Sequence, residues 1–137
     1  MFVTFEGIDG SGKSTQARLL AEALRGAGHE VVLTREPGGS QGAEEIRRLV
    51  LEGATDRWSP MTELLLFTAA RRDHLERLIE PALARGAVVI CDRFTDSTRM
   101  YQGMEREGGA NLRGLVDQLH KMVIPREPDL TMLIDID

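Results

Sequence analysis

The sequence has 137 residues, a length that fits one domain, and a formal net charge of −5. Its 42% hydrophobic and 28% charged residues are ordinary values for a globular protein. The acidic balance argues against a broad nucleic-acid groove, which would need a basic face, but it allows a few arginines around one phosphate group.

Cysteine usage and hydropathy indicate the compartment. Cys91 is the single cysteine, so it has no partner for an internal disulfide, and a reducing cytoplasm is the expected location. No apolar run reaches the length of a membrane span, and the first residues lack the pattern of a signal peptide. All basic residues except Lys13 and Lys121 are arginines.

The first half of the chain predicts two strand–helix pairs. Residues 3–6 are expected to form a short strand, and after a glycine-rich turn residues 13–25 form a helix. A second strand is predicted at 31–34 and a second helix at 43–52. In the first helix Ala17, Leu20 and Leu24 are expected to share one face, and in the second Ile46, Leu49 and Val50 are expected to be buried.

The second half predicts a long helix and two further strands. Ser59 is a suitable N-cap with Pro60 in the first helical position, so a helix is expected from there to Arg85, with a kink at Pro81. The apolar run at 87–91 is typical of a strand buried on both faces. The remaining predicted elements are helices at 96–101 and 111–123 and another buried strand at 130–135.

This alternation predicts an α/β fold with three layers, in which helices cover both faces of a parallel sheet. Ligands bind such sheets at the carboxyl ends of the strands. The last predicted strand has an apolar pattern with no covering helix after it. We therefore expect residues 1–137 to be a single domain that is incomplete at its C-terminus.

Residues 7–14 match the phosphate-binding pattern G-x-x-x-x-G-K-[ST] in full, between a predicted strand and a predicted helix. In such P-loops the backbone N–H groups and the positive end of the helix dipole surround a phosphate. Lys13 would reach the β- and γ-phosphates, and the Ser14 hydroxyl can ligate Mg²⁺. A glycine-rich turn without function is the alternative, but a lysine here, in so arginine-rich a chain, favours the P-loop.

Three further residues lie at predicted strand ends. Asp92 closes an apolar strand, where an aspartate can hold Mg²⁺ through water, while Cys91 is expected to be a core residue. Arg35 and Arg93 could grip a second phosphate, although each alone could be a surface charge. A GTPase is excluded within this chain, since its one asparagine, Asn111, is not followed by lysine.

The order and spacing of five segments resemble the motif set of bacterial thymidylate kinases. The segments are residues 6–15, 34–39, 67–71, 92–94 and 97–103. The resemblance implies a P-loop NTPase-like fold and transfer of the γ-phosphoryl group of ATP to thymidine monophosphate, with Mg²⁺, in a homodimer. It also implies a mobile lid and an adenine-binding loop after the last strand. Gly10 and Ser11 stand where some family members carry an arginine, which other members supply from that lid.

The resemblance also implies a role for each matching residue. The ATP site would comprise Gly7, Ile8, Asp9, Gly10, Ser11, Gly12, Lys13, Ser14 and Thr15. Lys13, Arg93 and Asp9 would be catalytic, with Asp9 holding the acceptor's 3′-hydroxyl, Arg35 its phosphate, and Arg93 the transferred group. Phe67 and Arg71 would recognise thymine, Tyr101 would disfavour ribose, Thr98 and Gln102 would adjoin the base and sugar, and Ser14 and Asp92 would lie near Mg²⁺.

The predicted third helix is compatible with a base-binding surface. Phe67, Arg71 and His74 are spaced to share one helical face. Phe67 could instead pack in the core, and His74 is expected to be an exposed or capping residue; Glu36 receives no role. Two alternatives remain open: another P-loop nucleotide or deoxynucleoside kinase, and a nucleotide-binding fragment without turnover.

Overall fold

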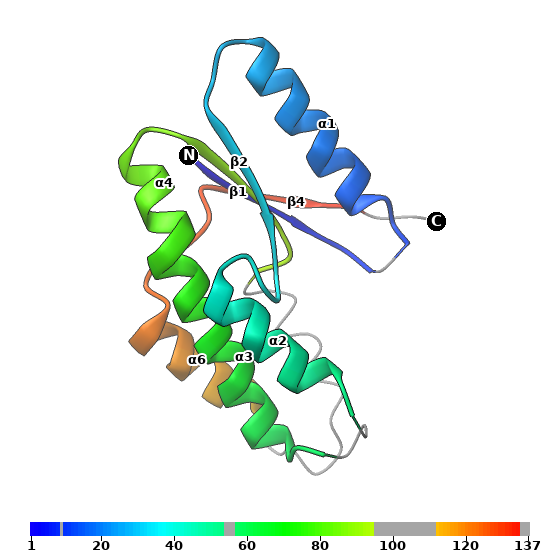
Figure 1. The fold of residues 1–137 in the computed structure, drawn as a ribbon, viewed down its shortest axis with the longest axis vertical. Helices are drawn as coiled ribbons and strands as arrows, with labels where there is room; N and C mark the ends of the chain where they lie inside the picture. The colour runs from blue at the N-terminus through cyan, green and yellow to red at the C-terminus, as the bar shows by residue number, and fades with distance from the viewer. Residues whose placement is uncertain (9, 54–56, 95–111, 135–137) are drawn as a thin grey trace.

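A computed structural model of the chain describes residues 1–8, 10–53, 57–94 and 112–134. Its centre is a four-stranded sheet in the order β2-β3-β1-β4 (Figure 1). All neighbouring strands are parallel, as predicted. The strands are β1 (Phe2–Glu6), β2 (Val31–Arg35), β3 (Val88–Asp92) and β4 (Leu130–Leu133).

Helices lie on both sides of this sheet, which confirms the three-layer architecture (Figure 1). α1 covers one face, and the run of η1 and α4, which continues α3, covers the other. None of the helices in the described part of the chain is long and apolar enough to cross a membrane. The helices are α1 (Lys13–Gly26), α2 (Gln41–Leu51), α3 (Pro60–His74), η1 (Leu75–Ile79), α4 (Glu80–Ala84) and α6 (Leu112–Val123). The predicted helix at 96–101 falls outside the described residues.

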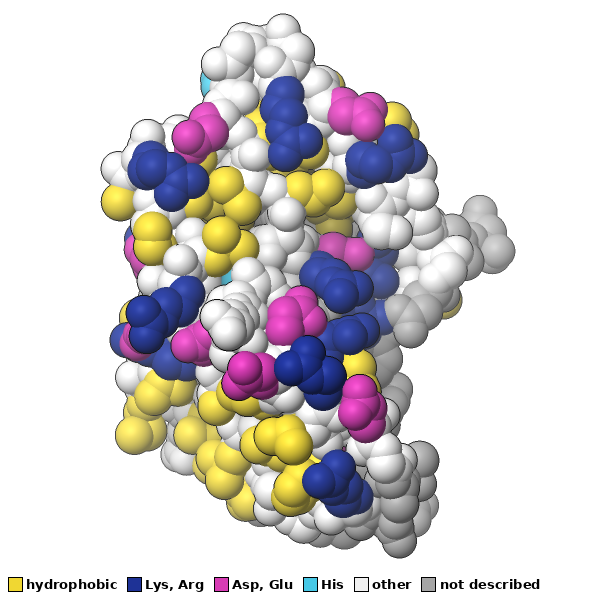
Figure 2. All heavy atoms as spheres, in the orientation of Figure 1, with side chains coloured by type: hydrophobic (Ala, Val, Ile, Leu, Met, Phe, Trp, Pro, Cys, Tyr) yellow, Lys and Arg dark blue, Asp and Glu magenta, His cyan; other side chains and the backbone are white. Residues whose placement is uncertain are grey.

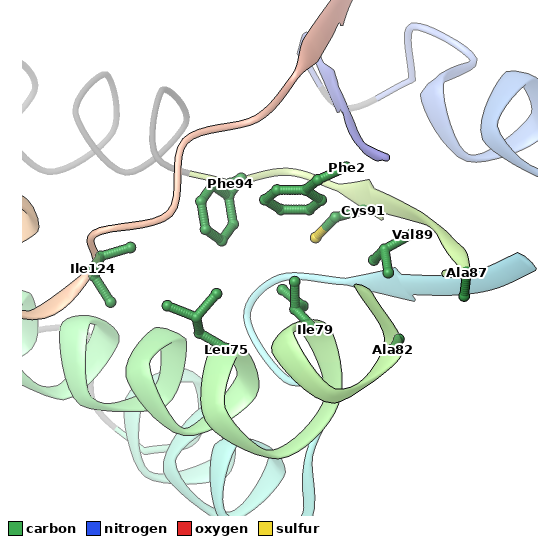
Figure 3. Packing of buried hydrophobic residues seen from close by; sticks show 9 residues of the cluster. All are labelled: Phe2, Leu75, Ile79, Ala82, Ala87, Val89, Cys91, Phe94 and Ile124. Carbon is green, nitrogen blue, oxygen red and sulfur yellow. The ribbon is translucent and has the colours of Figure 1, made fainter. Parts of the chain in front are cut away.

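Two apolar clusters hold the layers together, because successive strand side chains point to opposite faces. The first lies between the sheet and the η1–α4 run, where Phe94 meets Phe2 edge-on at 5.0 Å between ring centroids (Figure 3). The second lies between the sheet and α1. The first comprises Phe2, Leu75, Ile79, Ala82, Ala87, Val89, Cys91, Phe94 and Ile124, and the second Val3, Phe5, Ala17, Ala21, Val31 and Ile90. Leu20 and Leu24 pack at the edge of the second, as predicted.

The long helix predicted from Pro60 runs to Ala84, but its irregular part precedes Pro81. Residues Leu75–Ile79 form a π-helical turn, and the N–H of Glu80 bonds to the carbonyl of Leu75. Proline cannot donate a hydrogen bond to the preceding turn. A wider turn next to it lets the helical run continue toward β3.

The second helix differs from its prediction at both its start and its buried face. Ser40 is the N-cap, and its Oγ accepts from the N–H of Ala43 at 3.2 Å, so α2 begins before residue 43. Ala43 is fully buried, Ile46 and Val50 are half-buried, and Leu49 is 43% exposed. The spacing of Ala43, Ile46 and Val50 follows one helical stripe toward α3, and Leu49 lies off that stripe.

The prediction of a buried last strand is wrong. Every residue of β4 is exposed, with Leu133 73% exposed. In the described part of the chain β4 is an edge strand that pairs only with β1, and no described helix covers it. Its attachment is polar instead: Asp129 accepts from the N–H of Phe2 at 2.7 Å, and Thr131 meets the Thr4 hydroxyl at 3.0 Å.

Candidate functional site

The P-loop connects the end of β1 to the first turn of α1. Gly12 is the N-cap residue of α1 and has a φ of 93°, a left-handed conformation that glycine adopts at little cost. A Cβ on Gly12 would meet no atom within 4 Å, so the backbone conformation and not crowding selects glycine here. Lys13, the first residue of α1, is only 6% exposed, and its Nζ lies 3.9 Å from Oδ1 of Asp92.

A cavity of about 660 Å³ lies over the P-loop. It brings together residues from the ends of β2 and β3 and the first turn of α1, as expected for a parallel sheet. Figure 2 shows several Lys and Arg side chains gathered in the middle of this view, between α1 above and α2 below. The polar and charged residues that line the cavity are Lys13, Ser14, Thr15, Arg35, Glu36, Arg47, Asp92 and Arg93.

Asp92 has the properties of a cation ligand. Burial raises the pKa of its carboxyl above the ordinary value, and the charges of Lys13 and Arg35 oppose that rise. Its buried Oδ1 has no hydrogen-bond partner among the described atoms. A carboxylate oxygen of this kind, close to the exposed Ser14, fits a hard cation such as Mg²⁺ that arrives with phosphate ligands of its own. The described residues contain no cluster of three metal-binding side chains that would hold a cation unaided.

Arg93 has a strained backbone, with a φ of 72°. A non-glycine residue in this region costs about 1–3 kcal/mol and persists only where its surroundings enforce it. Here hydrogen bonds enforce it: the N–H of Arg93 donates to Phe5 O at 2.9 Å, and its carbonyl accepts from Sγ of Cys91 at 3.0 Å. The next residue, Phe94, donates its N–H to Glu6 at 2.7 Å. These hydrogen bonds therefore hold Arg93 at the cavity despite the strain.

A buried charge cluster lies beside the cavity, around Glu36. Nε of Arg71 donates to Oε1 of Glu36 at 2.5 Å, and Nδ1 of His74 is hydrogen-bonded to Oε2. Burial is the largest influence on the pKa of Glu36 and acts to raise it. The charge of Arg71 and the hydrogen bond from His74 outweigh burial, so the pKa is lowered. Glu36, which sequence reasoning left without a role, is thus the centre of an ion-pair network.

The expectation that His74 is exposed or caps the helix is wrong. The residue is fully buried, and its Nε2 lies 2.8 Å from the hydroxyl of Thr34. The loop after Glu36 closes over the ring: Gly39 has a φ of 95°, and a Cβ there would collide with the imidazole of His74. The charge on Glu36 draws His74 inward, and the sequence around His74 carries no sign of this partner.

Arg71 also contacts His120 and Phe94. Its Nη1 lies 2.9 Å from Nε2 of His120 on α6, and its Nη2 donates to the carbonyl of Phe94 at 3.0 Å. The guanidinium carbon lies 5.0 Å from the centre of the Phe94 ring. Arg71 is only 4% exposed, whereas Phe67, one helical turn earlier, is half-buried. A flat ligand would therefore meet a fixed guanidinium beside a partly accessible aromatic ring.

Comparison with known proteins decides the family. The sequence profile of thymidylate kinases matches residues 5–137. The chain belongs to the thymidylate kinase family. The thymidylate kinase of Ruegeria pomeroyi is 78% identical over 137 residues, which is 100% of this chain and 64% of that protein. That of Dinoroseobacter shibae is 71% identical over 134 residues, 98% of this chain and 63% of that protein. The chain thus spans less than two thirds of these relatives.

A solved thymidylate kinase confirms the P-loop NTPase-like fold. The crystal structure of the enzyme from Ehrlichia chaffeensis has a TM-score of 0.87 and 48% sequence identity, and covers 100% of this chain and 77% of that one. Of the residues selected by resemblance, those the structure brings to the cavity are Gly10, Gly12, Lys13, Ser14, Thr15, Arg35, Asp92 and Arg93. Phe67 and Arg71 lie on α3. Asp9, Thr98, Tyr101 and Gln102 fall outside the described residues.

Sequence reasoning missed three residues besides His74. Arg47 on α2 lines the cavity as a further positive charge. Because α2 follows the loop after β2, the sequence position of Arg47 could have suggested a place near the phosphate site. Glu36 stands within a matched motif, but its partners lie 35 and 38 positions away in sequence. His120 belongs to no matched motif, so nothing in the sequence indicated a role for it.

The strain at Arg93 predicts an unusual order of stabilities. Arg93→Gly should leave the free energy of unfolding unchanged or raise it, because glycine adopts the left-handed conformation readily. Arg93→Ala should be less stable than Arg93→Gly by about 1 kcal/mol, since alanine keeps the strain. Urea denaturation of the two variants checks this order. An alanine variant as stable as the glycine variant would show that the left-handed backbone is not maintained in solution.

The buried ion pair predicts a large, pH-dependent cost for Glu36→Gln. The amide would face two donors, and the charge of Arg71 would lose its partner, at a cost of about 3–5 kcal/mol. Because the pKa of Glu36 is lowered by folding, its contribution is complete above roughly pH 4.3, the ordinary value, and is lost as the pH falls through the folded value. Denaturation from neutral to acidic pH should therefore show the two proteins converging.

Glu80→Gln is the matched control for that experiment. Glu80 also pairs with an arginine, Arg126, at 2.6 Å, but its side chain is 40% exposed. Surface pairs of this kind contribute about 0–1 kcal/mol. Equal losses in the two variants would mean that Glu36 is not buried with its partners.

Proposed function

We propose that this protein phosphorylates thymidine monophosphate to thymidine diphosphate, with ATP as donor and Mg²⁺ as cofactor. The observation that carries the proposal is the shared cavity, in which the P-loop lysine lies beside three arginines and the partly buried Asp92. Such a cavity can bind the phosphates of a donor and an acceptor together. The names of the similar proteins support thymidine monophosphate as the acceptor.

The charged residues have separable roles in this proposal. Lys13 binds the β- and γ-phosphates, and the P-loop N–H groups orient them. Arg35 holds the acceptor phosphate, Arg93 stabilises charge on the transferred group, and Arg47 adds positive potential on the acceptor side. Ser14 and Asp92 would hold Mg²⁺, which when bound neutralises phosphate charge. Most of the rate enhancement in such a transfer comes from alignment and charge stabilisation.

The base-binding role falls to α3. Three N–H groups of Arg71 already point at Glu36, His120 and the Phe94 carbonyl, which leaves one N–H on each terminal nitrogen for a ligand. A donor-only group selects a ring carbonyl, which thymine has at C4 and cytosine lacks. Phe67 would stack on the base. We propose further contacts to the sugar and base because the positions match motifs of the family: Asp9, Thr98, Tyr101 and Gln102.

We also propose a homodimer in the cytoplasm. Apolar side chains remain exposed on α2 and α3, which pack against each other: Leu49 is 43%, Met61 44% and Leu65 50% exposed. Figure 2 shows hydrophobic side chains gathered in the lower part of the molecule, where these helices lie. A second copy is the occupant we propose for that surface. The single buried thiol of Cys91 is consistent with a reducing compartment.

Lys13→Ala should abolish phosphoryl transfer without unfolding the protein. We expect turnover to fall by roughly a thousandfold or more, since this charge acts on the transferred phosphoryl group. A coupled kinase assay on the complete gene product checks turnover, and circular dichroism checks the fold. Lys121→Ala is the control, because it removes the one other lysine from an exposed position on α6. A folded Lys13→Ala variant with near-normal turnover would contradict the proposed function.

The enzyme should distinguish thymine from cytosine nucleotides more strongly than it distinguishes thymine from uracil nucleotides. We expect deoxycytidine monophosphate to be a poor substrate, because its amino group faces donors on Arg71. Deoxyuridine monophosphate should be only about 10–200-fold worse than thymidine monophosphate, the usual effect of one methyl group. Comparing kcat/KM for the three nucleotides tests this. Equal values for the cytosine and thymine nucleotides would refute the base-binding role of α3.

A further inference from the structure

We propose that His120 is a positioning residue that sets base selectivity by acting as a hydrogen-bond acceptor for Arg71. The proposal rests on the proposed function and deepens it, because it names a residue that need not touch the substrate. His120 lies on α6 and is 3% exposed. Its Nε2 is 2.9 Å from Nη1 of Arg71, and its Nδ1 is 2.7 Å from the carbonyl of Val116.

The two contacts determine which ring nitrogen of His120 carries the proton. A guanidinium can only donate hydrogen bonds, so Nε2 facing Arg71 must be unprotonated. A carbonyl can only accept, so Nδ1 facing Val116 must carry the hydrogen. The imidazole is therefore neutral and in the Nδ1-protonated tautomer, which the helix carbonyl of Val116 maintains.

His74 has the opposite function on the other side of the same ion pair. Its Nδ1 faces the carboxylate of Glu36, which can only accept, so this ring supplies a donor. One imidazole thus donates to the anion of the pair, and the other accepts from the cation. The network joins the end of β2, helix α3 and helix α6 through Glu36, Arg71 and His120.

The consequence is a guanidinium with a fixed orientation. Arg71 is held at Nε by Glu36, at Nη1 by His120 and at Nη2 by the carbonyl of Phe94, and it is only 4% exposed. Without the acceptor on α6, one terminal N–H would lose its partner and the fork could rotate about the remaining contacts. The two N–H groups left for a ligand would then no longer point in one direction, and a ring carbonyl would lose its advantage over a ring amino group.

The test compares His120→Leu with His120→Gln. Leucine removes the acceptor and keeps an apolar side chain, whereas glutamine keeps an acceptor oxygen and cannot take up a charge. For His120→Leu we expect the KM for thymidine monophosphate to rise roughly tenfold or more and kcat to change little, with a similar loss of preference over deoxycytidine monophosphate. His120→Gln should recover most of that preference. Lys121→Gln, at the exposed neighbouring position, should behave as the unmodified protein.

Each result supports or overturns the proposal. A folded His120→Leu variant with undiminished base preference overturns it. If that variant does not fold, His120→Gln decides, because full preference supports the acceptor role and lost preference overturns it. Absence of thymidine monophosphate turnover in the unmodified protein would instead refute the proposed function.

The tautomer can be measured independently of any activity. Long-range proton–nitrogen NMR spectra of the histidine rings distinguish the Nδ1-protonated from the Nε2-protonated form and from the imidazolium. We expect His120 to show the Nδ1-protonated form in the unmodified protein. An Nε2-protonated or charged ring would overturn the proposal whether or not the protein is a kinase, because such a ring cannot accept a hydrogen bond from Arg71.

Discussion

The packing of α3 against the end of β2 depends on the ion pair and hydrogen bonds of the buried Glu36 carboxylate. A charge removed from water must be paired and hydrogen-bonded, or it destabilises the fold by several kcal/mol. Glu36 satisfies this requirement with Arg71 and His74 from α3, while its own N–H extends the sheet ladder by donating to Asp92 O at 2.9 Å. One residue therefore ties α3 to the end of β2 and the end of β2 to the end of β3.

Three consecutive residues, of which the first ends β3, connect this cluster to the phosphate cavity. Asp92 lines the cavity beside Lys13, hydrogen bonds hold Arg93 there with a strained backbone, and the side chain of Phe94 lies in the core. The ring of Phe94 meets Phe2 edge-on (Figure 3). The face of the same ring and the Phe94 carbonyl contact Arg71. A displacement of Phe94 in the core would therefore be felt at Arg71 and Arg93 together. The hydrogen bonds of Cys91, Arg93 and Phe94 offset the strain at Arg93.

The parts of the fold that could be predicted from sequence are those that depend on local pattern. The strands, α1 and the P-loop follow from hydrophobic periodicity and glycine placement, and the motif order identified the family. The misassigned residues depend on distant neighbours. Leu49 is exposed because α2 buries the side of the helix that carries Ala43 and Ile46. β4 is exposed because it lies at the described edge of the sheet. His74 is buried because it is hydrogen-bonded to the buried Glu36.

The arginines proposed to hold the acceptor differ in a way that matches their tasks. The side chain of Arg35 is 59% exposed, whereas that of Arg71 is 4% exposed and held at three nitrogens. Attraction to a phosphate tolerates a mobile cation, since the Coulomb energy varies slowly with direction. Recognition of a base requires N–H groups whose direction is fixed before the ligand binds. The side chain then loses little conformational entropy on binding. Under the proposed function, the contacts of Arg71 with Glu36 and His120 serve this second task, which Arg35 does not have.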